Sequence, residues 1–331
     1  MEIRGLSNNG ENNCYLNVLI QIFWNFPEIK QKIITKAHSH SSSPCVTCEL
    51  SSLFISMEFS GTRNFSINSL KSAIFSLHDK EIDNEFGCAI ENFEQILDIF
   101  HKESEILIEN DCSSTCLAHY FFSMSLGNYS KCCGISKVEN ESPYLFLSIL
   151  AKDLENWVFF NETINKKFED LLKFTLDSGE NKSFCAKCRK ISRCTKIFIK
   201  LPKILAITVL WDLRDHRFCN VFTNSLHYNV KIPNYHNGQA DYTNYILKGI
   251  VCFKINHYCC YFFNSILKIW YIFDDTYSRR LKNLMEVIKN MRSNGGVPVI
   301  LFLEHVGEKE LTFEDIESYV DELNCSNCQV L

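Results

Sequence analysis

The spacing of apolar residues predicts that the first third of the chain is mostly helical. Residues 67–108 carry apolar side chains at the 3.6-residue interval of a helix, at Phe93, Ile96, Leu97 and Phe100. An earlier helical pattern follows the polar loop SHSSSPCVTCEL and includes Leu50, Leu53, Phe54 and Met57. Near residue 112 this pattern ends, and β-type segments with alternating apolar residues begin around residues 120–126.

Strand-like segments dominate the second half of the chain. From Thr195 onward, short runs of β-branched and aromatic residues are separated by polar turns: KIFIKLP, ILAITVLWD, YILKGIVCFKI, HYCCYFF, WYIFDD and VPVILFLE. Short strands joined by such turns predict an antiparallel meander. Helices first, then a cysteine-bearing β insert and then an antiparallel sheet, define an α+β fold class.

One segment, residues 5–26, combines a Gly/Asn-rich loop with an almost unbroken apolar helix. The loop residues favour turns and caps, so we expect the helix to begin close to Cys14 and to stop before Pro27. Its few polar residues, Asn17, Gln21 and Asn25, recur every four positions and share one face with Cys14. This pattern predicts a buried helix that turns one polar stripe toward a cleft.

A cysteine at this position has two interpretations. The first turn of a helix carries unpaired N–H groups and a partial positive charge, which favour thiolate over thiol and so favour a nucleophile. The alternative is a small core cysteine at a helix start, the commoner use of the residue.

The composition and charge of the chain limit the functions that it can have. The 331 residues are 46% hydrophobic and 13% aromatic, enough for a substantial core. A net charge of -5 with no basic run disfavours nucleic-acid binding. We expect no signal peptide in residues 1–26, because the apolar run after Cys14 carries Asn17 and Gln21, and we find no apolar stretch of the roughly 18 residues that a membrane span needs. We therefore expect a cytoplasmic protein, with the nucleus as a second location, whose 17 cysteines are thiols, metal ligands or a nucleophile rather than disulfides.

A thiolate nucleophile needs an imidazole and a group that orients it. His257 begins one predicted strand, and Asp274 ends the next. Adjacent antiparallel strands place the start of one opposite the end of the other, so His257 and Asp274 are expected to be neighbours. Either residue could instead be purely structural.

Four motifs, in order, resemble those of the ubiquitin-specific proteases (the USP/UCH family, peptidase C19). GLSNNGENNCYLN resembles the family's Cys box, and HYCCYFF followed by WYIFDDTYS resembles its His box. IFIKLPKILAITVLWD is similar to the strands before that box, and CAIENFEQIL to a degenerate QDAxEF helix. The similarity is greatest to a divergent branch with a GQNSCFLN-like Cys box and extra cysteines in the helical region.

This resemblance implies a papain-like hand with a helical thumb, zinc-bearing β fingers and an antiparallel β palm. The catalytic domain would be residues 1–305, divided at about 1–120, 121–195 and 196–305, followed by an acidic tail at 306–331. It would be a thiol-dependent deubiquitinase that hydrolyses the isopeptide bond at the C-terminus of ubiquitin or within polyubiquitin. The alternatives are a weak or inactive ubiquitin-binding scaffold and a zinc-dependent structural protein.

Residue by residue, the resemblance implies Cys14 as nucleophile, His257 as general base and Asp274 as its orienting carboxylate. Asp275 would be a secondary polar group, and Asn8 would stabilise the oxyanion. The Cys box has one extra residue here, so Asn9 or Asn13 could take that last role. The sequence also departs from the family at Asn256, Cys259, Cys260 and Cys88, and none of these is a member of the triad.

Two groups of cysteines have the spacing of structural zinc ligands. In the fingers, Cys185 and Cys188 form one C-x-x-C pair. The other pair is reduced to Cys133, with Cys132 beside it and Ser130 where its first cysteine would stand. In the helical region, Cys45, Cys48, Cys112 and Cys116 form two further pairs, with His119 as an alternative fourth ligand, and predict a zinc site in the thumb. The alternatives are a finger that has lost its zinc and, in the thumb, thiols with no metal.

The C-terminal residues carry two weaker patterns. An acidic segment from Thr312 begins with a T-x-x-D capping pattern and predicts a solvated helix. The last four residues, CQVL, fit a geranylgeranylation motif at Cys328, and a chance match is the alternative.

Overall fold

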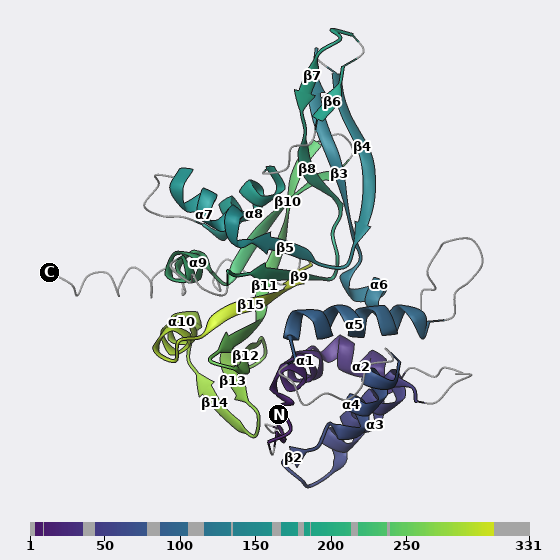
Figure 1. Cartoon of the computed structure of the whole chain (residues 1–331), viewed down its shortest axis with the longest axis vertical. Coiled ribbons are helices and arrows are strands. Elements are labelled where there is room, and N and C mark those ends of the chain that lie inside the picture. The colour runs from purple at the N-terminus through teal and green to yellow at the C-terminus, as the bar shows by residue number, and fades with distance from the viewer. Residues whose placement is uncertain are drawn as a thin grey trace, which may run out of the picture.

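The computed structural model describes residues 4–8, 10–35, 44–77, 87–104, 116–133, 135–160, 167–177, 182–185, 187–212, 218–236 and 239–307 (Figure 1). Its helices are α1 Cys14–Asn25, α2 Pro27–Thr35, α3 Val46–Phe59, α4 Asn68–Ser76, α5 Ala89–Lys102, α6 Leu117–Phe122, α7 Ala151–Phe160, α8 Phe168–Asp177, α9 Cys219–Ser225 and α10 Leu284–Ser293. The first third of the chain is helical, as its apolar spacing predicts.

The strands are β1 Gly5–Leu6, β2 Asn64–Phe65, β3 Met124–Cys132, β4 Ile135–Tyr144, β5 Leu147–Leu150, β6 Lys182–Phe184, β7 Ile191–Arg193, β8 Thr195–Lys200, β9 Ile204–Leu210, β10 Asn229–His236, β11 Gln239–Lys254, β12 His257–Asn264, β13 Ile269–Asp274, β14 Tyr277–Leu281 and β15 Val297–His305. One large sheet contains most of them, in the order β14-β13-β12-β11-β10-β8-β3-β4. A branch of this sheet continues from β11, where β15 pairs with β11, β9 with β15 and β5 with β9.

The predicted α+β class is confirmed, and the antiparallel strands expected in the second half of the chain belong to a larger sheet that also contains parallel pairs. Strands β10 to β14 form the expected antiparallel meander. However, β10 pairs with β8 in parallel, and β5 pairs with β9 in parallel, so the sheet is mixed. The connections between these parallel strands contain helices, such as α9 before β10, which residue alternation alone did not reveal.

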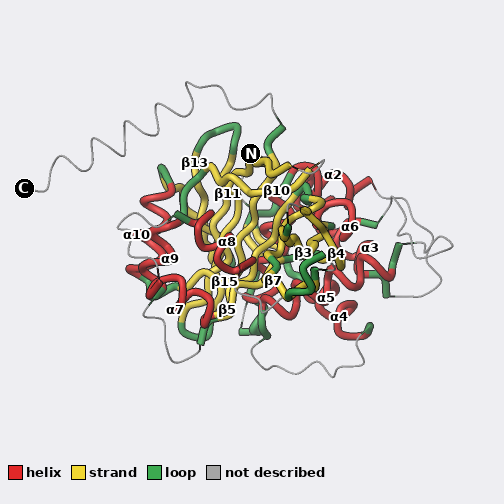
Figure 2. Tube along the Cα trace, turned by 90° about the horizontal axis from the view of Figure 1, so that it is seen from above, coloured by secondary structure: helices red, strands yellow, loops and turns green. Residues whose placement is uncertain are grey.

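Helices cover both sides of the sheet. Viewed from above, α2 to α6 lie on one side of the strands, and α7, α9 and α10 lie on the other (Figure 2). The long hairpin β3–β4 extends away from these layers and carries the short hairpin β6–β7 near its end (Figure 1). No described helix is long and apolar enough to span a membrane.

Two hydrophobic cores follow from the alternation of side chains along the strands. In β12, Cys260 and Phe262 belong to the core that contains α1, whereas Cys259 and Tyr261 belong to the core that contains α10. Both cysteines are therefore packing residues in a strand that is buried on both faces.

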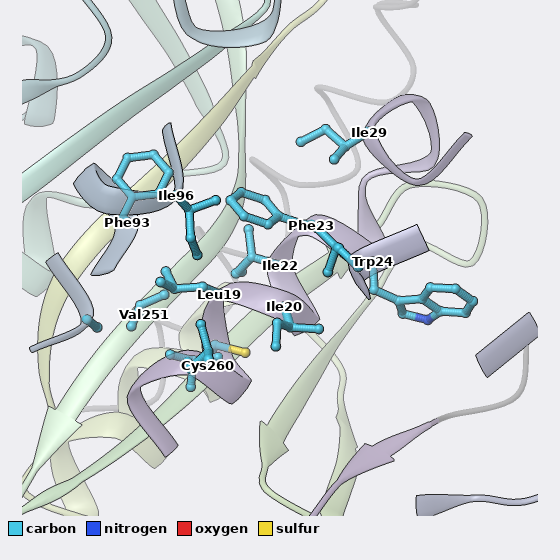
Figure 3. Packing of buried hydrophobic residues seen from close by; sticks show 14 of the residues in the cluster. Leu19, Ile20, Ile22, Phe23, Trp24, Ile29, Phe93, Ile96, Val251 and Cys260 are labelled. Atoms are coloured by element: carbon cyan, nitrogen blue, oxygen red, sulfur yellow. The ribbon is translucent and has the colours of Figure 1, made fainter. Parts of the chain in front are cut away.

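Helix α1 lies at the centre of the first core, and all twelve of its residues are buried. Its apolar side chains contact residues of α5, β11 and β12, including Phe93, Val251 and Cys260 (Figure 3). The polar stripe does not face an open cleft as predicted. Gln21 donates to the Arg4 carbonyl, because the N-terminal segment lies beside this face, and Asn25 donates to the Gln21 carbonyl within the helix.

Candidate active site

The loop before α1 positions Cys14 as the first residue of the helix. Gly10 and Asn12 have left-handed backbone conformations, with φ of 81° and 50°, which turn the loop just before the helix. Asn13 is the N-cap, and its carbonyl accepts hydrogen bonds from Leu16 and Asn17. Cys14 is only 3% exposed and lies in the first turn of α1.

Strands β12 and β13 bring His257 and Asp274 together, as their spacing predicts. His257 Nε2 lies 2.5 Å from Asp274 Oδ1, and the His257 ring also hydrogen-bonds the Cys14 thiol. Because Nε2 is used by the carboxylate, Nδ1 is the ring nitrogen that remains for the sulfur. The structure thus joins Cys14, His257 and Asp274 in one hydrogen-bonded chain.

Lys254 is a fourth member of this group that the sequence did not single out. It is the residue of β11 directly opposite His257, across the turn formed by Ile255 and Asn256. Its Nζ lies 2.6 Å from Asp274 Oδ2. Asp274 therefore uses one oxygen for the imidazole and the other for an ammonium group.

Charges in this group shift the pKa values in the directions that an ion pair requires. The hydrogen bonds to Asp274 and Cys14 outweigh burial and raise the pKa of His257 to about 10. Burial opposes ionisation of Asp274, but the hydrogen bonds from His257 and Lys254 prevail and lower its pKa. At neutral pH the group consists of an imidazolium, a carboxylate and an ammonium.

Asp275 is held by two asparagines rather than by the imidazole. Asn8 Nδ2 donates to Asp275 Oδ2 at 2.9 Å, and Asn17 Nδ2 donates to Oδ1 at 2.8 Å. The distance from His257 Nε2 to Asp275 Oδ2 is 4.0 Å. Asn8 Oδ1 also accepts the backbone N–H of Asn13, so the Asn8 amide is fixed at the edge of the site.

The two other oxyanion candidates differ from Asn8. The Asn13 side chain is fully buried and is directed toward α4, where it donates to Asn68 and accepts from Lys71. Lys71 Nζ also donates to the Glu11 carbonyl, so this lysine of α4 holds the loop that precedes α1. Asn9 lies outside the described residues.

Cys88 occupies the N-cap position of α5, where its side chain makes no capping hydrogen bond. The thiol instead interacts with the Tyr258 hydroxyl, next to His257 in sequence. Cys88 therefore contacts the residue next to His257 and is not part of the Cys14–His257–Asp274 chain.

Four cysteines converge in the β3–β4 and β6–β7 region. The sulfurs of Cys132, Cys133, Cys185 and Cys188 all lie within 4.8 Å of one another. Cys132 Sγ lies 3.7 Å from Cys133 Sγ and 3.4 Å from Cys188 Sγ. Ligands of tetrahedral zinc at 2.3 Å have sulfurs about 3.8 Å apart, so this set fits a structural zinc ion.

The fourth cysteine of this set, Cys132, was missing from the three ligands expected from the sequence. Two successive residues can both bind because Cys133 has a left-handed backbone, with φ of 54°, which turns its side chain back toward that of Cys132. The sequence did carry a signal for Cys132, because two adjacent cysteines followed by a glycine stand at the end of a predicted strand.

The predicted thumb site is only partly represented in the described residues. Cys112 lies outside them. Cys45 is the N-cap of α3, and its sulfur accepts a hydrogen bond from the backbone N–H of Cys48. Neither cysteine joins a group of three or more ligands within the described residues. Cys116 instead lies beside His119, the alternative ligand, and beside His101, which the sequence did not suggest.

His257, Asp274 and Asp275 also lie close enough together to hold a metal ion. The Lys254 ammonium 2.6 Å from Asp274 opposes a divalent cation there, and His257 Nε2 already faces the carboxylate. The arrangement suits acid–base chemistry with a thiol rather than metal binding.

An α+β fold with a cysteine at a helix N-terminus and a histidine–aspartate pair on adjacent strands is the architecture of a papain-like thiol protease. Residues 4–302 match the family model described as "Ubiquitin carboxyl-terminal hydrolase". The chain belongs to this family.

Known relatives are distant and much longer. The chain is 23% identical to ubiquitin carboxyl-terminal hydrolase 53 of Homo sapiens over 295 residues, which are 82% of this chain and 27% of that protein. It is 23% identical to ubiquitin carboxyl-terminal hydrolase 54 of Rattus norvegicus over 297 residues, with coverages of 84% and 19%. The chain thus spans about a quarter or less of the length of these relatives.

Solved structures confirm the fold. One is a SAGA Ubp8/Sgf11/Sus1/Sgf73 DUB module bound to ubiquitin aldehyde, with a TM-score of 0.66, 19% identity and coverage of 92% of this chain and 70% of that one. Another is the Saccharomyces cerevisiae PAN2 pseudoubiquitin-hydrolase, with a TM-score of 0.62, 16% identity and coverages of 94% and 88%.

Proposed function

We propose that this chain is a deubiquitinase that hydrolyses the isopeptide bond between the C-terminal glycine of ubiquitin and a lysine. The observation that carries the proposal is the hydrogen-bonded chain from Cys14 through His257 to Asp274. Members of the family that bind ubiquitin support the choice of substrate, since two similar structures hold ubiquitin aldehyde and monoubiquitin.

In the first half of the reaction, the Cys14 thiolate attacks the carbonyl carbon of the ubiquitin glycine. The His257 imidazolium donates its proton to the lysine nitrogen as the C–N bond breaks, so the amine leaves neutral and a thioester remains on Cys14. Because its pKa is raised, His257 is protonated at neutral pH and can donate this proton.

In the second half, neutral His257 takes a proton from water, and the hydroxide oxygen attacks the thioester carbon. The C–S bond breaks, and the thiolate–imidazolium pair is restored. Ubiquitin leaves with a free carboxyl group, which releases its proton to solvent and becomes a carboxylate. Asp274 keeps the ring oriented throughout, because its Oδ1 holds Nε2 and directs the opposite nitrogen toward the sulfur.

The negative oxygen that forms in each half requires hydrogen-bond donors. The Cys14 backbone N–H belongs to the first turn of α1, whose N–H groups have no partner within the helix. Asn8 is the side-chain donor we assign beside it, because its amide is fixed at the edge of the site by Asp275 and Asn13. One such donor contributes about 3 kcal/mol of transition-state stabilisation.

The four-cysteine set suits the fingers that would grip ubiquitin. When bound there, zinc would hold the hairpins β3–β4 and β6–β7 in a fixed relative position. Its role would be structural, since the set contains four thiolates and leaves no position for substrate.

The second candidate function is an inactive ubiquitin-binding scaffold. The similarity to the PAN2 pseudoubiquitin-hydrolase favours the scaffold function, because that protein has the same fold and is described as a pseudo-hydrolase. The two functions differ in turnover alone.

Hydrolysis of a fluorogenic amide attached to the C-terminus of ubiquitin tests the proposal. We expect turnover by the purified chain, and its loss in Cys14→Ala and His257→Ala variants. Binding of ubiquitin without turnover, at protein concentrations above the dissociation constant, would establish the scaffold function instead.

A further inference from the structure

A second cluster of metal-ligating side chains lies outside the active site, where α5 meets α6. It consists of His101, Cys116 and His119, whose candidate ligand atoms all lie within 4.8 Å of one another. His101 is in the last turn of α5, Cys116 is the N-cap of α6, and His119 is one turn further along. We propose that these three residues bind a zinc ion that joins the two helices.

The distances match those around a tetrahedral ion. Cys116 Sγ lies 3.2 Å from His119 Nδ1 and 3.9 Å from His101 Nδ1. A sulfur at 2.3 Å and a nitrogen at 2.0–2.1 Å from zinc are about 3.5 Å apart when the angle is tetrahedral. The observed separations lie on either side of this value, so binding requires shifts of a few tenths of an ångström.

Hydrogen bonding alone accounts poorly for this arrangement. Both Nδ1 atoms face the same sulfur, and that sulfur also lies 3.8 Å from the Phe100 carbonyl. A thiol has one proton to donate and is a weak acceptor, so it cannot make good hydrogen bonds to all three atoms. A metal ion bound by a thiolate and two neutral imidazoles satisfies the sulfur and both nitrogens together.

The surroundings resemble those of a structural site. Cys116 is fully buried, and the rings of His101 and His119 pack with their centres 4.8 Å apart. Nitrogen and sulfur donors in a tetrahedral arrangement favour zinc among the available divalent ions. Three protein ligands leave one position for water or for a further side chain.

The site would fix the junction between the helices and the fingers. Helix α6 leads directly into β3, the strand that ends at the four-cysteine set. Glu103, two residues after His101, accepts the backbone N–H groups of Val46 and Thr47 at the start of α3. An ion at His101 would thus stabilise the point where α3, α5 and α6 meet.

Zinc content and X-ray absorption of the purified chain test the proposal, independently of any enzymatic activity. We expect about two zinc equivalents in the wild type and about one in a Cys132→Ser/Cys188→Ser variant, from which the finger zinc is lost. The remaining zinc should show nitrogen ligands at about 2.0–2.1 Å with the scattering pattern of imidazole. A His101→Ala/His119→Ala variant should lose about one equivalent, whereas the exposed-histidine control His305→Ala should lose none.

Two results would overturn the proposal. One is unchanged zinc content in the His101→Ala/His119→Ala variant. The other is a remaining zinc with sulfur ligands only, which would indicate an all-cysteine site in the thumb. If the Cys132→Ser/Cys188→Ser variant fails to fold, the X-ray absorption spectrum of the wild type tests the proposal. One zinc equivalent with sulfur ligands only would exclude the histidine site.

Discussion

Lys254 Nζ lies 2.6 Å from Asp274 Oδ2, on the same carboxylate whose other oxygen lies 2.5 Å from His257 Nε2. The carboxylate is therefore shared between two cations. A positive charge at Lys254 reduces the stabilisation that Asp274 gives to the imidazolium, and it keeps Asp274 ionised. We therefore expect Lys254 to act as a positioning residue that tunes the ion pair through Asp274.

We expect Lys254→Met to shift the alkaline limb of Cys14 reactivity to higher pH, because the imidazolium loses a competing cation. The measurement is the rate of alkylation of Cys14 by chloroacetamide as a function of pH. Lys254→Arg should retain the wild-type profile, and Lys289→Met on the outer surface of α10 is the matched control. A profile of Lys254→Met that coincides with the wild type would exclude the tuning role.

The raised pKa of His257 also predicts a pH-dependent contribution to stability. A pKa raised from 6.5 to about 10 stabilises the folded state fully below pH 6.5, and this contribution is lost as pH rises toward 10. The difference in unfolding free energy between wild type and His257→Gln should therefore be largest in mildly acidic solution and small near pH 10. Urea denaturation at a series of pH values measures it, and a difference that grows with pH would contradict the assignment.

Alanine substitutions of Asn8 and Asn13 should have different effects, the first on the catalytic rate and the second on stability. Asn8→Ala should lower kcat about 10²–10³-fold, because it removes the proposed oxyanion donor. Asn13→Ala should cost about 1–3 kcal/mol of stability, because it leaves the buried Lys71 ammonium without one of its acceptors. Steady-state kinetics and denaturant unfolding of both variants check this, and a larger loss of kcat in Asn13→Ala would reverse the two roles.

The four-cysteine set should be needed for ubiquitin binding and not for the chemistry. Cys132→Ser/Cys188→Ser should lose about one zinc equivalent and bind ubiquitin more weakly. Its rate of Cys14 alkylation by a small reagent should remain that of the wild type, and Lys187→Ser in the same hairpin is the control. Unchanged ubiquitin affinity after loss of the metal would show that the site does not support binding.

The sequence could predict those features that depend on local chemistry. The start of α1 at Cys14 and its end before Pro27 follow from the turn residues and the proline that flank it. The pairing of His257 with Asp274 follows from two strands joined by a short turn, whose register is set by neighbours in the chain. The four-cysteine set was found except for its adjacent member, Cys132.

Features that depend on distant parts of the chain were not predicted. Lys254 looks like an ordinary strand residue until its register opposite His257 is known. Lys71 and His101 acquire their contacts only when α4 and α5 pack beside the loop and α6.

Helix α10 was missed for a different reason, because it lies within a strand-rich region and its local signal was overlooked. Asn283 followed by Glu286 is a helix-start pattern, and the Asn283 side chain accepts the Glu286 N–H in the structure.

The most direct test of the proposed function is reaction with a ubiquitin probe that carries a C-terminal electrophile, read by intact mass and peptide mapping. We predict one covalent probe per chain, located on Cys14, and no adduct in the Cys14→Ala variant. Full binding of ubiquitin with Cys14 unmodified would contradict the account and identify the chain as a non-catalytic member of its family.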